Sequence, residues 1–110
     1  MNTSFIYMLT NKNNTVLYIG VTSNLIKRVY QHKSKLYKGF TSKYNCDQLV
    51  YFEEFLDVNL AIAREKQLKS GDRKRKEELV NKLNPNWNDL SVGYLTVIKR
   101  LHVKIRRSDL

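Results

Sequence analysis

The stretch SFIYMLTNKNNTVLYIG, residues 4–20, decides the fold of this chain. Both of its flanks, Ser4–Thr10 and Thr15–Gly20, are rich in aromatic and branched residues, which favour β-strands. The polar segment Asn11–Asn14 between them predicts a tight turn, because asparagine tolerates left-handed backbone and hydrogen-bonds locally. The stretch therefore predicts an antiparallel hairpin.

Closing the hairpin about this four-residue loop pairs Thr10 with Thr15 and sets Tyr7 directly opposite Tyr18. Cross-strand partners share one face of a sheet, so the two phenol groups are expected to point at one spot. On this pattern alone, a pair of core aromatics is the better interpretation. The residues downstream favour a functional one.

A helix is predicted to follow the hairpin from about Leu25 to Tyr37, with Ser23 or Asn24 as its N-cap and with Gly39 ending it. Its inward stripe is predicted to be Leu25, Val29, His32 and Leu36. Arg28 and His32 are four residues apart, so they lie on one helix face.

The rest of the chain predicts one more strand and two more helices. The strand is Gln48–Phe55, with Val50 and Phe52 on one face and Leu49 and Tyr51 on the other. Asp57 or Asn59 caps the next helix, whose inward stripe holds Val58, Ala61, Ile62, Glu65, Leu68 and Lys69. Ser70-Gly71-Asp72 interrupts it, and a final helix runs from about Arg73 to Leu83, with Leu79, Val80 and Leu83 inward, until Asn84-Pro85 ends it. The predicted fold class is α+β: a small three-stranded antiparallel sheet, formed by the hairpin and the third strand, flanked by helices.

The length of 110 residues indicates one domain, predicted over residues 1–90, followed by a basic tail over residues 91–110 that is either helix or strand. Cys46 is the single cysteine, which excludes an internal disulfide and a cysteine zinc cluster and fits a reducing cytoplasm. No apolar run is long enough to span a bilayer, and no signal-peptide pattern is present. We therefore expect a cytoplasmic protein without a membrane partner.

The net charge of +10 points to a polyanionic partner, most often nucleic acid. The cations are expected to form a basic track beside the face of the first helix, and such side chains bind phosphates without reading bases. Tyr37, Phe40 and Tyr44 are candidates for stacking on unpaired bases. The predicted nucleic-acid contacts are Lys27, Lys35, Lys43, Tyr44, Lys69, Arg73, Lys74, Arg75 and Lys76.

Several segments, taken in chain order, resemble the GIY-YIG nuclease superfamily, and in particular its small stand-alone bacterial members. They are Phe5-Ile6-Tyr7, Tyr18-Ile19-Gly20, Asn24-Leu25 with Arg28 and His32, Phe40–Tyr44, Leu49-Val50-Tyr51, Ala63–Lys69 and Asn84–Leu90. The resemblance covers roughly residues 4–90, and its order is more specific than any one piece. Phe5 stands where the family's first triplet begins with glycine, which is a departure at a variable position.

The resemblance implies a divalent-metal-dependent DNA endonuclease whose products carry 5′-phosphate and 3′-hydroxyl ends. Glu65 would bind a single Mg²⁺ or Mn²⁺, and Arg28 would contact phosphate. An ordinary phenol ionises at about pH 10, so a tyrosine base needs nearby positive charge. The resemblance favours Tyr7 as that base, supported by Tyr18 and His32. Glu65 could instead pair with Arg28 or Lys69 in a structural role.

The family asparagine, an amide that tethers the last turn, is assigned to Asn88, with Asn84 as the alternative, because the spacing from Glu65 is longer than in the excision-repair members. The expected catalytic set is thus Tyr7, Tyr18, Arg28, His32, Glu65 and Asn88. The substrate is expected to be single-stranded or branched DNA in repair, recombination or processing, with RNA not excluded. The oligomeric state is open, a monomer included. The alternative function is a nucleic-acid-binding module that keeps the fold but turns over little or not at all.

Overall fold

The computed structural model describes residues 3–36 and 38–92. Three antiparallel strands form one sheet in the order β2-β1-β3: β1 is Ser4–Thr10, β2 is Leu17–Thr22 and β3 is Gln48–Phe55. The helices are α1 (Leu25–Lys33), α2 (Phe40–Lys43), α3 (Val58–Ser70) and α4 (Arg73–Leu83). The α+β class and the three-stranded antiparallel sheet are confirmed. The predicted tail lies, apart from Ser91 and Val92, outside the described residues.

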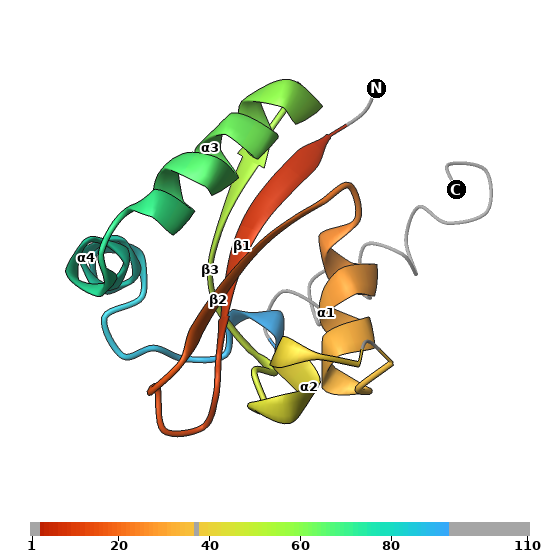
Figure 1. The fold of residues 1–110 in the computed structure, drawn as a ribbon, viewed down its shortest axis with the longest axis vertical. Helices are drawn as coiled ribbons and strands as arrows, with labels where there is room; N and C mark the ends of the chain where they lie inside the picture. Colours follow the sequence, from red (N-terminus) through yellow and green to blue (C-terminus); the bar gives the residue numbers. More distant parts are fainter. Residues whose placement is uncertain (1–2, 37, 93–110) are drawn as a thin grey trace.

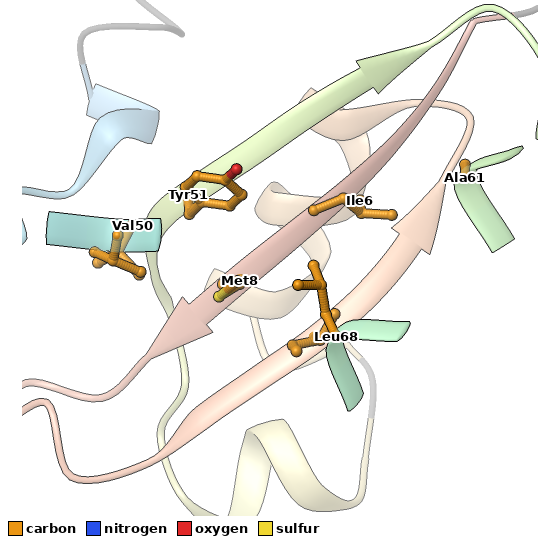
Figure 2. Packing of buried hydrophobic residues seen from close by; sticks show 8 residues of the cluster. Ile6, Met8, Val50, Tyr51, Ala61 and Leu68 are labelled. Atoms are coloured by element: carbon orange, nitrogen blue, oxygen red, sulfur yellow. The ribbon is translucent and has the colours of Figure 1, made fainter. Parts of the chain in front are cut away.

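The sheet separates two helical layers (Figure 1). Because side chains alternate along β1, Ile6 and Met8 pack under α3 and α4 on one face, whereas Tyr7 and Leu9 pack under α1 on the other. Figure 2 shows the first of these clusters, in which Ile6 and Met8 of the central strand pack with Ala61 and Leu68 of α3. The two faces of one strand thus present two different surfaces to the two layers.

The predicted register of the hairpin is wrong by two residues. Thr10 pairs with Leu17 instead of Thr15, and Tyr7 pairs with Gly20 instead of Tyr18. The reason is the Asn11 side chain, whose Oδ1 accepts hydrogen bonds from the backbone N–H groups of Thr15 (2.8 Å) and Val16 (3.1 Å) and so holds both residues out of the strand ladder. An even shift keeps every side chain on its face.

The faces of β3 also differ from strict alternation. A bulge opposite the Met8–Leu9 step shifts the register, so that Met8 pairs with Tyr51 and Leu9 with Leu49. Val50 and Tyr51 consequently both belong to the α3 side, and Leu49 and Phe52 belong to the α1 side. The predicted bounds of β3 are confirmed, and its predicted faces are wrong.

The first helix is shorter than predicted. It ends at Lys33, Ser34 caps it, and Lys35 adopts a left-handed conformation with φ 56°. Leu25, Val29 and His32 are buried as predicted, whereas Leu36 lies beyond the helix and is 64% exposed. A short helix that the sequence analysis did not predict, α2, follows this segment.

The later helices follow the sequence closely. The Asp57 and Asp72 side chains cap α3 and α4 through the N–H groups of Asn59 and Arg75, and α4 has the predicted bounds. Ala61, Leu68 and Val80 are buried as expected, but Val58 and Leu83 are exposed. None of the helices over residues 3–36 and 38–92 is both long and apolar enough to cross a bilayer.

Candidate active site

A buried chain of hydrogen bonds runs through the α1 side of the sheet. The Tyr7 hydroxyl lies 3.0 Å from Nε2 of His32, and Nδ1 of His32 lies 3.0 Å from Oγ1 of Thr41. Tyr7 is 0% exposed, His32 6% and Thr41 8%. The chain therefore joins β1, α1 and α2 across the interior, and the predicted partnership of Tyr7 and His32 is present.

Gly20 makes room for this chain. A Cβ atom built at Gly20 would lie only 2.5 Å from Cζ of Tyr7, so the Tyr7 ring occupies the space that any other residue would fill. The corrected register explains this contact, because Gly20 is the cross-strand partner of Tyr7. The glycine of the second triplet is thus required by a close approach between neighbouring strands.

Tyr18 still lies near Tyr7, because the register shift keeps it on the same face. The two ring centroids are 6.3 Å apart, and the Tyr18 centroid is 5.7 Å from that of His32. The prediction of two phenols gathered at one spot therefore holds, with a diagonal instead of a direct pairing.

A cavity of about 240 Å³ opens beside this cluster. Its lining combines a phenol, an imidazole, a guanidinium and an ammonium group, and a second hollow of about 290 Å³, reaching from Thr22 to Gln31, shares Arg28 with it. The lining residues of the first cavity are Tyr18, Arg28, His32, Lys38, Phe40 and Thr41. Arg28 and His32 therefore meet on one helix face, as their spacing predicts.

The electrostatics of the cavity favour an anionic guest. Burial lowers the pKa of His32, and the Arg28 guanidinium nearby lowers that pKa further, so the imidazole is neutral at neutral pH. Arg28 and Lys38 contribute a guanidinium and an ammonium group to the lining of the cavity. A phosphate group bound in this cavity would lie near two cations, Arg28 and Lys38, and near the hydrogen-bonding side chain of Tyr18.

The two tyrosines differ in their access to this cavity. Tyr7 is fully buried and is not among the lining residues, whereas Tyr18 is half-buried and lines the wall. Both nitrogens of His32 face buried hydroxyl groups. The cavity wall therefore presents Tyr18 and His32, and Tyr7 is buried behind His32, to which it is hydrogen-bonded.

Glu65 lies on α3, on the other side of the sheet from α1 (Figure 1). Its side chain is 17% exposed, and its carboxylate pairs with Lys69 at 3.2 Å, which is one of the two structural pairings expected from the sequence. Glu65 is not among the residues that line the cavity. The structure therefore gathers Tyr7, Tyr18, Arg28 and His32 on the α1 side of the sheet, whereas Glu65 belongs to α3 and is outside the cavity lining.

The donor set decides which metal would suit this chain. Over residues 3–36 and 38–92 there is no cluster of three or more His, Cys, Asp or Glu side chains. A protein-only zinc or calcium site is therefore not formed there. One carboxylate suits Mg²⁺ or Mn²⁺, which keep several waters and share substrate phosphates. Glu65 fits that group once Lys69 releases it.

The tether of the last turn is made by Asn84, not by Asn88. The Asn84 side chain is 5% exposed, and its Nδ2 donates to the carbonyls of Val50 (3.1 Å) and Asn88 (2.8 Å). Its Oδ1 accepts from the Asn88 N–H at 3.1 Å. Asn88 itself is exposed and enters this arrangement through its backbone. A catalytic role for Asn88 stays a prediction.

The sequence analysis missed Asp89, which holds the end of the described chain to α1 and β3. One carboxylate oxygen accepts from Lys33 Nζ at 2.6 Å, and the other accepts from the backbone N–H of Leu49 and from Ser91. Burial acts to raise the pKa of Asp89, but hydrogen bonds from Lys33, Ser91 and the Leu49 N–H outweigh it, so this pKa is lowered. An acid in a turn, 56 residues from Lys33 in sequence, gives no local signal.

The predicted nucleic-acid contacts do not form a single track. Lys27 and Lys43 lie in the α1–α2 layer, Tyr44 lies next to Lys43, and Lys35 is hydrogen-bonded to Asn45. The basic run of α4 lies across the sheet, in the other layer (Figure 1). In that run Arg73 donates to the carbonyls of Asn14 and Thr15 and pairs with Glu77, while Lys74 and Arg75 are exposed and Lys76 is half-buried. Lys69 pairs with Glu65.

Comparison with known proteins gives a consistent result. The family model of the GIY-YIG catalytic domain matches residues 3–79. A UPF0213 protein from Pediococcus pentosaceus is 35% identical over 82 residues, which covers 74% of this chain and 85% of that protein. A second UPF0213 protein, from Natronomonas pharaonis, is 34% identical over 76 residues, or 69% of this chain and 88% of that protein.

A solved structure shares the fold. The solution NMR structure of a UPF0213 protein from Bacillus halodurans superposes with a TM-score of 0.52, covering 80% of this chain and 93% of that one at 24% identity. This likeness shows that the two chains share the fold.

Proposed function

The chain belongs to the GIY-YIG family, a nuclease family, and from that premise we propose that it is a divalent-metal-dependent DNA endonuclease. Its products would be 5′-phosphate and 3′-hydroxyl ends. The observation that supports this best is the single cavity in which Tyr18, Arg28 and His32 meet. Its role would be repair, recombination or processing of DNA, with weak sequence preference.

Phosphodiester hydrolysis needs an activated water, a neutralised phosphate and a fixed geometry. Arg28 offers a planar fork of donors that matches a phosphate. Tyr18 is the phenol that lines the cavity in which the attacking water would lie. We therefore assign Tyr18 the proton from the attacking water and Arg28 the phosphate contact.

Tyr7 and His32 would hold the Tyr18 ring in position. The neutral imidazole takes part in two buried hydrogen bonds, to the hydroxyls of Tyr7 and Thr41, which fix its ring. The Tyr18 ring packs against His32 with centroids 5.7 Å apart, so a fixed imidazole also fixes the phenol. We therefore rank Tyr18 above Tyr7 as the proposed base, the reverse of the order that the family resemblance suggests.

A bound Mg²⁺ or Mn²⁺ would neutralise phosphate charge and stabilise the leaving oxygen. GIY-YIG nucleases are generally divalent-metal dependent. In this chain Glu65 would hold the ion, and the Lys69 ammonium would have to leave the carboxylate first. Lys69 is 53% exposed and can swing into solvent, which makes this release inexpensive.

A binding module without turnover is the second candidate, and one observation favours it. The Glu65 carboxylate pairs with Lys69 and is not among the residues that line the cavity with Arg28, the expected phosphate ligand. A protein that only bound nucleic acid would need the cations and not the carboxylate.

Cleavage of supercoiled plasmid, single-stranded DNA and a branched junction separates the two. Each substrate is incubated with Mg²⁺, with Mn²⁺ or with EDTA. Three proteins are compared: the wild type, Glu65→Gln and the matched control Glu77→Gln. In the wild type the Glu77 carboxylate also pairs with a cation at i,i+4, namely Arg73. Metal-dependent cutting that Glu65→Gln abolishes and Glu77→Gln retains supports the nuclease. Binding without cutting on every substrate supports the module.

A further inference from the structure

Two aromatic side chains stand exposed at the mouth of the cavity. Phe40 is 49% exposed and Tyr44 is 41% exposed, and both belong to the segment of α2. Phe40 lines the cavity together with Tyr18 and His32. Half-exposed rings at the rim of a hollow leave apolar area in water, which is costly unless a ligand covers it.

These rings form a continuous surface with the proposed catalytic phenol. The rings of Tyr18 and Phe40 are stacked, with centroids 6.0 Å apart and planes inclined by 28°. The centroid of Tyr44 lies 4.7 Å from that of Phe40. A planar group resting on the exposed area would therefore lie one ring away from the cavity.

Cations flank this surface. Lys38 lines the cavity beside Phe40, and the ammonium of Lys43 lies 5.4 Å from the centre of the Tyr44 ring. An ammonium resting on a ring is held by cation–π attraction. A base stacked on Tyr44 would displace the Lys43 ammonium from the ring. The ammonium would then lie beside the adjoining phosphate, so that Tyr44 would contact the base and Lys43 the phosphate of one nucleotide.

The backbone under the two rings is fixed before any ligand arrives. Gly39 enters α2 with φ 123°, and Asn45 leaves it with φ 56°. The N–H of Cys46 donates to the carbonyl of Thr41 at 2.9 Å, and Thr41 is anchored from inside by His32. A surface held in this way loses little conformational entropy when it binds.

We propose that Phe40 and Tyr44 form a stacking site for an unpaired base of the substrate, next to the cavity that would hold its phosphate. The inference rests on the proposed function and sharpens it, because a paired base inside a duplex cannot offer its face to the rings. The preferred substrate would then be a single strand, a frayed end or a branch point, bound with little sequence preference.

The test is the affinity for a short fluorescent single strand and for the matched duplex, measured in EDTA by anisotropy. Wild type, Phe40→Leu and Tyr44→Leu are compared with Tyr30→Leu, a control that removes an exposed ring (61%) from α1 away from the cavity lining. We expect each site variant to weaken single-strand binding by roughly fivefold or more and to leave duplex binding unchanged. The Tyr30→Leu protein should bind both probes as the wild type does.

Equal losses for strand and duplex, or no loss from Tyr44→Leu, would overturn the proposal. Tyr44→Leu guards against a folding defect in Phe40→Leu, since Phe40 also packs on Tyr18. Replacing single bases of the strand by abasic sites adds a second readout, which should reproduce the loss at one position. Because EDTA prevents metal-dependent cutting, a stacking site that survives while plasmid cleavage fails would refute only the nuclease.

Discussion

At the scale of single residues, the geometry of the site depends on Gly20 and His32. Gly20 is needed because the Tyr7 ring fills the position of its missing side chain. His32 is held neutral in a buried chain of hydroxyl groups. Together these contacts fix the positions of the Tyr7 and Tyr18 rings relative to the cavity.

Gly20→Ala should destabilise the protein by about 1–3 kcal/mol, because its Cβ would lie 2.5 Å from Cζ of Tyr7 and push the ring away. Urea denaturation measures the free energy of unfolding. Gly71→Ala is the matched control, since its Cβ would meet its nearest atom at an ordinary 3.5 Å. Equal stability of the Gly20→Ala protein and the wild type would refute the close packing of Tyr7 across β2.

The lowered pKa of His32 predicts a pH dependence of stability. Below pH 6.5, the ordinary pKa of histidine, His32 is protonated in the unfolded chain but stays neutral in the folded protein. The free energy of unfolding therefore falls as the pH drops through that value. It levels off below the lowered native pKa. His32→Gln should flatten this slope between about pH 7 and pH 5 in urea denaturation. An unchanged slope in the variant would show that His32 is not the responsible group.

The sequence predicted which residues gather at the site better than how they contact one another. Tyr7, Tyr18, Arg28 and His32 follow from the hairpin and from helical spacing, which are local patterns. The ranking of Tyr7 over Tyr18 could not be judged from sequence, because exposure depends on how deeply α1 and α2 cover β1. Thr41 was missed for the same reason, since its bond to His32 joins two elements.

At the scale of elements, bounds were predicted well wherever a strong local signal stands. β1, β3 and α4 match their predicted ranges, and the aspartate caps of α3 and α4 explain why those helices begin where they do. The register of the hairpin was mispredicted because the Asn11 side chain lengthens the loop. A bulge likewise changed the faces of β3, and neither feature has a signature in a strand pattern.

Asp89 carries the most specific contact between elements that the sequence did not reveal. Asp89→Ala should cost about 1–3 kcal/mol of unfolding free energy, because it leaves the Leu49 N–H and the Lys33 ammonium without this acceptor. Thermal or urea denaturation measures the loss. The control is Glu77→Ala, which removes a partly exposed i,i+4 pair and should change stability by less than about 1 kcal/mol. Similar small losses in both variants would contradict the anchoring role.

At the scale of the whole molecule, the sheet divides the cations of the described residues between two helical layers. The cavity lies in the α1–α2 layer, and the α4 cations lie in the other. A sequence gives the total charge but not this division, which requires the sheet topology. The two layers are expected to contribute unequally to the binding of nucleic acid at the cavity.

Duplex binding at increasing salt tests that division. Four cations of the α1–α2 layer, Lys27, Arg28, Lys38 and Lys43, predict a slope of log K against log salt of about −3 or steeper. Neutralising Lys27 and Lys38 with glutamine should reduce the slope by about two. Neutralising Lys74 and Arg75 in the same way is the control and should change it less. A larger effect from the α4 pair would place the bound duplex on the other layer.

The central claim is that the cavity beside Tyr18 is the place of hydrolysis, and single-turnover plasmid nicking with Mg²⁺ tests it most directly. Wild type, Tyr18→Phe and Tyr30→Phe are compared at saturating protein, with binding measured in parallel. We predict that Tyr18→Phe slows nicking by about 100-fold or more and leaves DNA affinity intact, while Tyr30→Phe nicks as the wild type does. Nicking by Tyr18→Phe at the wild-type rate would contradict the account.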